Sequence, residues 1–253
     1  MHLKLSNFES IIDIVENASI LVKNFYNTGF AVKTKKDLSP LTQADITSHN
    51  FISSKLLALH PDIPILSEED HNNFSLSSKN DMFWCLDPLD GTKEFIAKND
   101  EFTINLALIS NQKPIFGIVT HPVKEISFFG LSELGAFSKN FFCNIKNQIF
   151  VKKRISTLTY AVSRSHLDEN TKKYISNGNI LKVGSALKLT YVANGMVDEY
   201  PRFSPCMLWD LAAGHCIINQ AGGSVKNLQG DEMTYNYHNL VNDSFIASNE
   251  GYD

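Results

Sequence analysis

The sequence predicts an α/β protein built from layers of helices and sheets. Apolar residues show helical spacing over residues 7–27 and again over about 42–59. Two β-rich runs, 103–109 and 115–121, are separated by a polar turn and predict a hairpin. From about residue 159 onwards, strand patterns alternate with helical patterns, which is typical of an α/β layer.

The elements of the first part follow from apolar periodicity and from the residues that interrupt it. The first helix places its apolar residues on one face, at Ile11, Ile12, Val15, Ala18, Leu21, Val22 and Phe25. The second helix ends before Pro61, because the residue before a proline is disfavoured in a helix. Short strands are expected at 63–66 and 82–86, and an antiparallel pair at 125–129 and 135–138.

The second part has a different rhythm. Strands are expected at 159–163 and 180–183, and helices at 168–176, 185–194 and 209–220. The pair Gly222-Gly223 ends the last helix, since glycine readily adopts the conformation that follows a helix C-terminus. We expect two closely packed halves, residues 1–155 and 156–253, that share one cleft.

Composition limits the classes of function. The chain has 253 residues, 43% of them hydrophobic, which is enough for a substantial core. Its 27 acidic and 23 basic residues give a formal net charge of −4. Because there is no basic surplus, a nucleic acid polymer is not expected as a partner.

Cysteine usage and the N-terminal segment predict a soluble cytoplasmic protein. The four cysteines are scattered and form no C-x-x-C pair, which fits a reducing compartment. Residues 1–20 include Glu9, Asp13 and Glu16. These charges interrupt the apolar run that a signal peptide or a membrane span requires.

The most informative segment is Asp87-Pro88-Leu89-Asp90-Gly91-Thr92, directly after the apolar run 82–86. Two carboxylates three positions apart repel each other in a poorly solvated place unless a cation compensates them. No Arg or Lys lies between residues 81 and 92, so a bound metal is the simplest compensation. Carboxylate ligands suit Mg²⁺, which commonly accompanies phosphate chemistry. The alternative interpretation is a structural turn.

Two further acidic segments adjoin apolar elements. Glu68 follows the expected strand 63–66, where a solvated acidic loop is the alternative interpretation. Asp210 opens the last helix, where it could simply cap the helix N-terminus. Together with Asp87 and Asp90 they supply the oxygens of a two-metal site, whose ions stabilise the attacking and leaving oxygens of phosphoryl transfer.

Three residues near these acids suggest phosphate hydrolysis. Gly91 and Thr92 offer backbone N–H groups with little steric bulk, which suits a phosphate. The Thr92 hydroxyl can orient a water molecule, and Asp45 could accept its proton. The alternative for Asp45 is a first-turn acid favoured by the helix dipole.

These motifs resemble the signatures of the inositol monophosphatase superfamily, from about residue 39 to residue 223. The similarity rests on Asp87–Thr92, on Ser67-Glu68-Glu69 and on Trp209-Asp210-Leu211-Ala212-Ala213-Gly214. The version Asp90-Gly91-Thr92-Lys93-Glu94-Phe95 looks like that of the CysQ-type 3′(2′),5′-bisphosphate nucleotidases, a subgroup of the superfamily. Inositol phosphatases more often have Thr-Asn or Ser-Asn at the Lys93-Glu94 position. The segments 163–166 and 200–203 also resemble the nucleotidase subgroup.

The resemblance implies a fold, an activity and a cofactor. The fold would be the α-β-α-β-α sandwich of the inositol monophosphatase and fructose-1,6-bisphosphatase type. The activity would be hydrolysis of 3′-phosphoadenosine 5′-phosphate, a by-product of sulfur assimilation, to AMP and phosphate. The resemblance also implies two or three Mg²⁺ ions and inhibition by Li⁺ or Ca²⁺.

Carried over by position, the resemblance also assigns residue roles. The metal ligands would be Glu68, Asp87, Leu89 through its carbonyl, Asp90 and Asp210. Asp45 and Thr92 would be the catalytic pair. Substrate binding would involve Glu68, Leu89, Asp90, Gly91, Thr92, Ser163, His166, Gly184, Lys188 and Asp210. The alternatives are a surface helix cap for His166 and an ordinary exposed lysine for Lys188.

Two other functions remain open at this point. An inositol or sugar monophosphatase would have the same fold and the same metal site. A non-catalytic regulator that binds nucleotide or metal would be expected to lack Thr92 or one of the carboxylates, all of which are present. The resemblance allows a monomer or a homodimer, and peripheral association with the cytoplasmic side of the inner membrane, although the sequence shows no anchor.

Overall fold

The computed structural model describes residues 5–34, 40–74, 82–141, 143–153, 157–165, 167–175 and 177–250. Within these ranges the α-helices are Glu9–Thr28 (α1), Gln43–Leu59 (α2), Thr92–Ala97 (α3), Glu169–Tyr174 (α4), Leu187–Ala193 (α5) and Leu208–Gln220 (α6). Short 3₁₀ turns cover Leu5–Asn7 (η1) and His71–Asn73 (η2).

The strands form two large sheets and two small ribbons. The seven-stranded sheet contains Ile65–Ser67 (β3), Met82–Asp90 (β4), Thr103–Ser110 (β5), Lys113–His121 (β6), Ile126–Leu131 (β7), Gly135–Asn140 (β8) and Asn147–Ile149 (β9). The five-stranded sheet contains Thr159–Ser163 (β10), Asn179–Val183 (β11), Glu199–Arg202 (β12), Ser224–Asn227 (β14) and Phe245–Ser248 (β16). The ribbons pair Val32–Thr34 (β1) with Pro40–Thr42 (β2) and Cys206–Met207 (β13) with Val241–Asn242 (β15).

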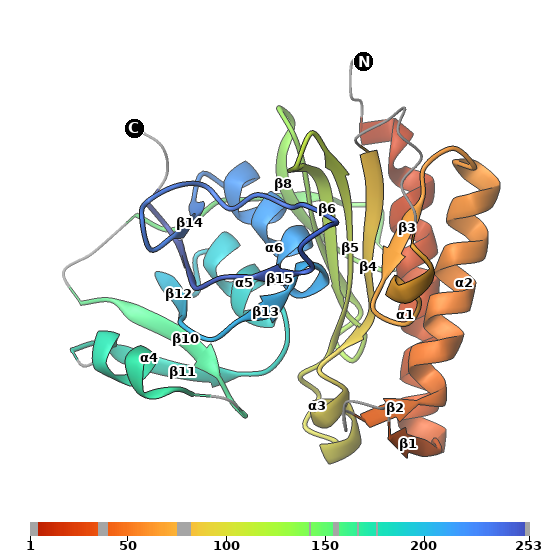
Figure 1. Cartoon of the computed structure of the whole chain (residues 1–253), viewed down its shortest axis with the longest axis horizontal. Helices are drawn as coiled ribbons and strands as arrows, with labels where there is room; N and C mark the ends of the chain where they lie inside the picture. The colour runs from red at the N-terminus through yellow and green to blue at the C-terminus, as the bar shows by residue number, and fades with distance from the viewer. Residues whose placement is uncertain are drawn as a thin grey trace.

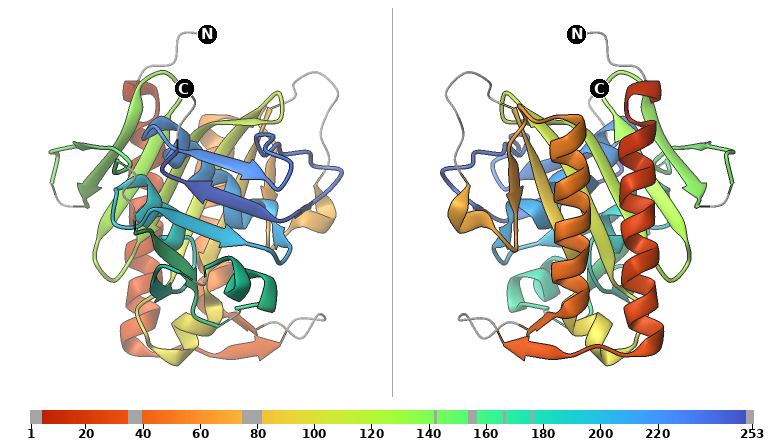
Figure 2. Two further views of the ribbon diagram at one scale, coloured as in Figure 1. Left: turned by 90° about the vertical axis from the view of Figure 1, so that its left-hand side faces the viewer. Right: turned by 90° about the vertical axis from the view of Figure 1, so that its right-hand side faces the viewer.

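The described residues stack in alternating layers of helices and sheets (Figure 1). Helices α1 and α2 run side by side across the outer face of the seven-stranded sheet (Figure 2). Helices α5 and α6 lie between the two large sheets, and α4 covers the opposite face of the five-stranded sheet (Figures 1 and 2). This order of layers confirms the predicted α-β-α-β-α fold.

The seven-stranded sheet is buried on both faces, which explains the unbroken apolar run at its centre. Strand β4 pairs in parallel with β3 and antiparallel with β5, and the remaining pairs are antiparallel. Trp84 and Leu86 pack with α1 and α2, whereas Phe83 and Cys85 pack on the side of α5 and α6. Successive side chains of a strand point to opposite faces, so two apolar layers require an apolar residue at every position.

The five-stranded sheet holds the parallel strands of the second part. Its order is β11-β10-β12-β16-β14, with β10 parallel to both of its neighbours and β16 antiparallel to β12 and β14. The parallel strands β10 and β11 end side by side, with Ser163 opposite Val183. Residues that follow these two strands therefore lie next to each other.

Two glycines let α6 lie directly on the large sheet. A Cβ atom at Gly117 would lie 2.4 Å from the Ala213 carbonyl oxygen, and one at Gly130 would lie 2.9 Å from Ile217 Cα. Neither contact leaves room for a side chain, so glycine is required for this close approach. The position of α6 matters because Asp210 lies in its first turn.

The structure corrects the expected end of β4. We predicted that this strand ends at Leu86, but it continues to Asp90. Between Asp87 and Asp90 the register against β5 shifts, and Asp87 faces Asn105 while Asp90 faces Thr103. The proline between them is tolerated because a bulge does not need its missing N–H.

Three other observations concern the expected compartment, the expected absence of a membrane span and the expected division of the chain. All four cysteines are unpaired, and Cys85, Cys206 and Cys216 are buried. No helix among the described residues combines the length and the apolar character needed to cross a membrane. Strand pairing changes from one large sheet to the other between β9 and β10.

Candidate active site

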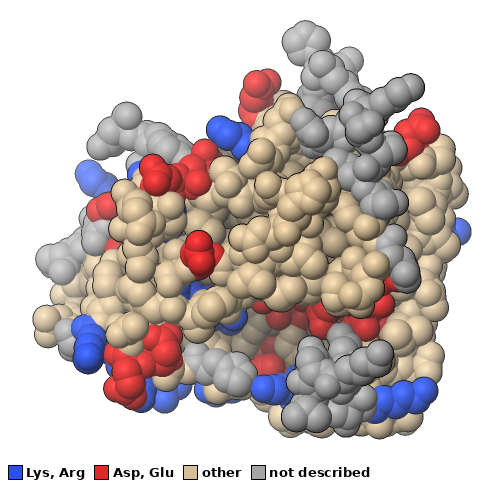
Figure 3. Space-filling model, in the orientation of Figure 1, with Lys and Arg blue, Asp and Glu red and all other residues tan. Residues whose placement is uncertain are grey.

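A pocket of about 260 Å³ is lined by residues of α3 and of both large sheets. Figure 3 shows it as a hollow in which acidic side chains gather. The carboxylates that line it are Glu68, Asp87, Asp90, Glu94, Asp168 and Asp210. The structure therefore brings the three acidic segments of the sequence to one place.

The bulge of β4 presents Asp87 and Asp90 to this pocket. Asp87 Oδ1 accepts the Leu89 N–H at 3.0 Å, which closes the turn inside the bulge. Asp90 Oδ2 accepts hydrogen bonds from the Ala186 N–H at 2.6 Å, from Asn105 Nδ2 at 3.1 Å and from Thr103 Oγ1 at 3.3 Å. Asp90 is thus fixed both by β5 and by the segment that precedes α5.

Asp210 caps its helix and also lines the pocket. Its Oδ2 accepts the Met207 N–H at 3.2 Å, which satisfies a backbone donor at the start of α6. The capping interpretation therefore describes a real contact, but it does not exclude a role in the pocket. Burial, followed by repulsion from Asp90, raises the pKa of Asp210 to about 7.

The other carboxyl groups of the bulge show the same electrostatic effect. Burial raises the pKa of Asp87 well above its ordinary value, and the charges of Glu68, Asp90 and Asp210 add to this effect. Burial also raises the pKa of Asp90, although Lys188 and the bonds from Asn105 and Ala186 oppose it. The pocket therefore favours a proton or another cation on these groups.

The structure brings two basic residues to the pocket that the sequence does not place near the motif. Lys188 is only 5% exposed, which excludes the interpretation as an ordinary surface lysine. Its Nζ donates to the Ser185 carbonyl at 2.5 Å, and burial lowers its pKa to about 8 against the opposing charge of Asp90. Arg202 also lines the pocket, and its positive charge partly opposes the rise in the pKa of Asp210.

These cations qualify the argument that a bound metal is the simplest compensation for the acids. Lys188 opposes the rise in the pKa of Asp90 and Arg202 opposes that of Asp210, but both pKa values remain raised. Local sequence cannot reveal such cations, because they lie about 100 positions from the motif. Arg202 was missed as a site residue, although its segment was noted.

The donor set fits Mg²⁺ in chemistry. Carboxylates and a backbone carbonyl are the hard oxygen ligands that Mg²⁺ prefers. Among the described residues, however, no three His, Cys, Asp or Glu side chains are gathered round one point as they would be round an ion. The chain thus offers suitable ligands that face one another across the pocket.

Asp45 and Thr92 meet although they are 47 positions apart. Thr92 Oγ1 lies 3.2 Å from Asp45 Oδ1 and 3.3 Å from the Leu89 carbonyl oxygen, so its proton can serve either acceptor. Asp45 is buried, and its Oδ2 accepts both the N–H and the hydroxyl of Thr42, at 2.7 and 2.5 Å. One oxygen of Asp45 therefore caps α2, while the other faces Thr92.

The predicted substrate residues are only partly brought together. Ser163 and Lys188 line the pocket with Gly91 and Thr92. Gly184 does not line it, and its N–H donates to Glu101 Oε2 at 2.8 Å. His166 lies outside the described residues. Asn105, Ser185 and Ala186, which surround Asp90 or line the pocket, carry no recognisable sequence signal.

Comparison with known proteins assigns the family. A model of the inositol monophosphatase family matches residues 6–251. The chain belongs to this family. It is 38% identical over 232 residues to the 3′(2′),5′-bisphosphate nucleotidase CysQ of Escherichia coli strain K12, covering 90% of this chain and 93% of the relative. It is 35% identical over 248 residues to the CysQ of Buchnera aphidicola, covering 95% and 92%.

Solved structures of inositol monophosphatase family members share the fold. The crystal structure of CysQ from Bacteroides thetaiotaomicron superposes with a TM-score of 0.81 at 33% identity and covers 97% of both chains. An inositol monophosphatase from Thermotoga maritima superposes with a TM-score of 0.80 at 25% identity, covering 96% of this chain and 92% of that one. The family and fold expected from the motifs are therefore confirmed.

Proposed function

We propose that this protein is a Mg²⁺-dependent 3′(2′),5′-bisphosphate nucleotidase that hydrolyses 3′-phosphoadenosine 5′-phosphate to AMP and phosphate. The observation that carries the proposal is one pocket in which a cluster of carboxylates faces Lys188 and Arg202. Such a pocket suits a substrate with two phosphate groups. Relatives at 35–38% identity that are named as this nucleotidase support the choice of substrate.

The proposed metal ligands are the carboxylates of Glu68, Asp87, Asp90 and Asp210 and the carbonyl of Leu89. When bound there, Mg²⁺ supplies positive charge for the phosphate oxygens and lowers the pKa of water. The raised pKa values of Asp87 and Asp210 support this assignment, because a cation relieves the repulsion that raises them.

The chain's own residues would direct the attacking water. If Thr92 donates its proton to Asp45, the Thr92 oxygen can accept a hydrogen bond from that water. As the new bond to phosphorus forms and the bond to the ribose oxygen breaks, a proton of the attacking water passes through Thr92 toward Asp45, and the leaving ribose oxygen takes up a proton from solvent water. The bonds from Thr42 hold the Asp45 carboxylate in place for this step.

The basic side of the pocket would bind the rest of the nucleotide. Lys188 and Arg202 carry the charge that a second phosphate requires. Ser163 also lines the pocket. The family resemblance adds His166 and Gly184 to the proposed substrate-binding residues. The proposed binding set thus also includes Gly91 and Thr92 beside the phosphate that is removed.

A substrate panel tests the proposal. Phosphate release from 3′-phosphoadenosine 5′-phosphate with Mg²⁺ is expected to exceed release from inositol 1-phosphate by about a hundredfold or more in kcat/KM, because only the nucleotide uses both charged walls. Li⁺ or Ca²⁺ is expected to inhibit. Faster cleavage of inositol 1-phosphate would favour a monophosphatase, and nucleotide binding without phosphate release would favour a non-catalytic regulator.

The division into halves 1–155 and 156–253 is supported by the change of sheet between β9 and β10. Two or three metal ions, a cytoplasmic location and a monomeric or homodimeric state follow the family resemblance. Peripheral association with a membrane stays a prediction without support from the described residues.

A further inference from the structure

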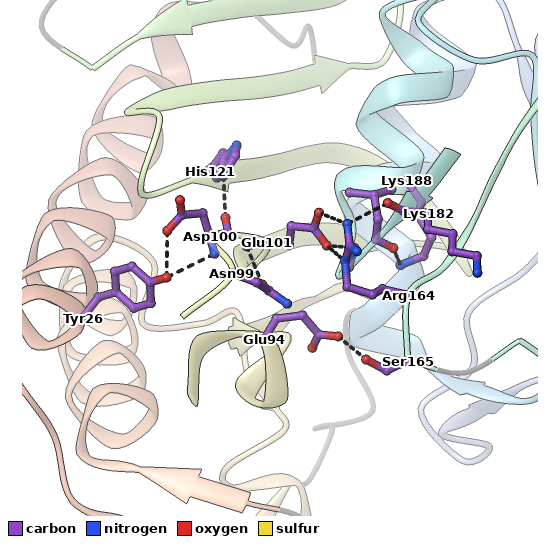
Figure 4. Close-up of polar contacts among 12 residues, drawn as sticks. Tyr26, Glu94, Asn99, Asp100, Glu101, His121, Arg164, Ser165, Lys182 and Lys188 are labelled. Carbon is purple, nitrogen blue, oxygen red and sulfur yellow. Dashed lines mark hydrogen bonds and ion pairs between the residues drawn. The ribbon is translucent and has the colours of Figure 1, made fainter. Parts of the chain in front are cut away.

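Glu101 connects the two halves of the molecule at the edge of the site (Figure 4). It lies between α3, which begins at Thr92, and β5. Its carboxylate accepts two hydrogen bonds from Arg164, one on each oxygen: from Nε at 2.6 Å and from Nη2 at 2.5 Å. Such a bidentate pair fixes orientation as well as distance.

The same carboxylate also binds the backbone beside the pocket. Glu101 Oε2 accepts the Gly184 N–H at 2.8 Å. Arg164 and Gly184 directly follow the parallel strands β10 and β11, so one acidic side chain ties together the ends of two neighbouring strands. Partial burial raises the pKa of Glu101, but the bonds from Arg164 and Gly184 outweigh this effect, and the net pKa is lowered.

The turn that starts at Gly184 reaches the proposed metal site within two residues. The Ala186 N–H donates to Asp90 Oδ2 at 2.6 Å, and the Ser185 carbonyl accepts Lys188 Nζ. Ser185 has a φ of 49°, a left-handed conformation that a residue with a side chain seldom adopts. Such a conformation persists only where its surroundings fix it.

The segment that carries Glu101 is itself held from the opposite side. Asp100 accepts the Tyr26 hydroxyl of α1 at 2.7 Å, and the Asp100 carbonyl oxygen lies 2.8 Å from His121 Nε2 (Figure 4). Glu101 therefore projects from a fixed loop rather than from a free one. Its side chain is 18% exposed, whereas that of Arg164 is 44% exposed.

We propose that Glu101 is a positioning residue that fixes the Gly184–Ala186 turn against Asp90, with Arg164 orienting its carboxylate. Loss of the Gly184 bond would release a turn that lines the pocket and holds both Asp90 and Lys188. Asp90 would keep its bonds from Asn105 and Thr103. Substrate binding should therefore suffer more than the chemical step. The kinetic part of this inference rests on the proposed function.

The test compares four variants by steady-state kinetics with 3′-phosphoadenosine 5′-phosphate and Mg²⁺. Glu101→Ala is expected to raise KM about tenfold and to lower kcat less than about threefold. Arg164→Ala keeps the Gly184 bond and is expected to raise KM less than about threefold. The double variant Glu101→Gln/Arg164→Ala keeps an acceptor for Gly184 and should match Arg164→Ala. Glu9→Ala is the control, because it removes another ion pair, with Lys146 at 2.6 Å, outside this pocket.

Two kinetic results would overturn the inference. One is a KM within twofold of the wild type in Glu101→Ala. The other is an equal increase in Arg164→Ala and Glu101→Ala, since the ion pair would then act only as a link between the halves. If Glu101→Ala does not fold, the double variant Glu101→Gln/Arg164→Ala provides the test. It keeps an acceptor for the Gly184 N–H, so a tenfold rise in its KM would contradict a role for that hydrogen bond.

Amide hydrogen exchange separates this inference from the proposed function. In the metal-free protein, exchange over residues 183–187 is expected to be about tenfold faster in Glu101→Ala than in Arg164→Ala. Equal exchange in the two variants overturns the positioning role whatever the substrate is. If the wild type cleaves no nucleotide but exchange accelerates as expected, the proposed function is wrong and the positioning role stands.

Discussion

One carboxyl group lies near each end of helix α6, and their surroundings shift their pKa values in opposite directions. Asp210, in the first turn, has a pKa raised to about 7 by burial and by repulsion from Asp90. Glu232, near the other end, has a pKa lowered to about 2, owing first to a hydrogen bond with His215, although burial lowers the pKa of His215 itself. Asn219 donates to Glu232 at 2.7 Å, and Lys113 lies 3.5 Å from it.

The difference separates what stabilises this protein from what it does. Around Glu232 each charge has an opposite or polar neighbour, as expected for a group that contributes to folding. Around Asp210 like charges are buried together, which lowers stability unless a cation enters. A fold retains such a cluster where it serves a function, and this one lies in the pocket.

The largest effect is expected from neutralising the acidic cluster. Asp90→Asn should lower the rate of phosphate release by about a thousandfold or more, because it removes a proposed metal ligand. The Asn oxygen can still accept the Ala186 N–H, so the metal-free protein should unfold at the same temperature or higher. Phosphate-release assays and thermal unfolding with a chelator measure the two effects.

Glu232→Gln is the matched control, because it makes the same chemical change at the other end of α6. The rate of phosphate release by Glu232→Gln is expected to stay within twofold of that of the wild type. A rate near that of the wild type in Asp90→Asn would contradict the assignment of the acidic cluster as the active site.

A smaller effect is expected at the proposed catalytic pair. Thr92→Val should lower kcat about a hundredfold, since it removes the hydroxyl that orients water, and Thr92→Ser should restore most of it. Thr92 is a better test than Asp45, because Asp45 also caps α2 and its loss would destabilise the fold by about 1 kcal/mol. Equal rates in Thr92→Val and the wild type would exclude a catalytic hydroxyl at this position.

Local patterns predicted the parts of the fold that depend on local causes. The strand at 159–163 matches β10, and the helix at 42–59 matches α2, which Thr42 caps. The predicted end of β4 was wrong, because Asp-Pro usually interrupts a strand and no local sequence pattern indicates a bulge. The short strands β12, β14 and β16 were missed, since edge-to-edge pairing with distant segments defines them.

The residues of the site likewise fall into those that local sequence predicts and those that it does not. The carboxylates beside strand and helix ends could be found from the sequence, because their neighbours are local. Arg202 and the Glu101–Gly184 bond could not, because they depend on packing between the two large sheets. The sequence suggested that Asp45 could accept the Thr92 proton, and the family resemblance assigned the two as a catalytic pair. Their contact across 47 positions depends on the fold.

The smallest expected effect is the pH dependence of stability at Glu232 and Asp210, which tests the contrast between these two groups directly. Glu232 has a folded-state pKa of about 2 against an ordinary 4.5, so its stabilisation is present above pH 4.5 and is lost as the pH falls toward 2. Asp210 has a folded-state pKa of about 7 against an ordinary 3.8. Its contribution is therefore lost as the pH rises from about 3.8 to about 7.

Two variants report these opposite slopes in chelator-treated protein. Glu232→Gln should lower the free energy of unfolding at pH 7 by about 1 kcal/mol or less, as exposed ion pairs do, and the difference should shrink below pH 4.5. Asp210→Asn should become more stable than the wild type as the pH rises from 4 to 7, and Mg²⁺ should reverse this order. If both variants lose stability at pH 7 without metal, the carboxylates of the pocket do not repel one another, and the contrast between the two ends of α6 fails.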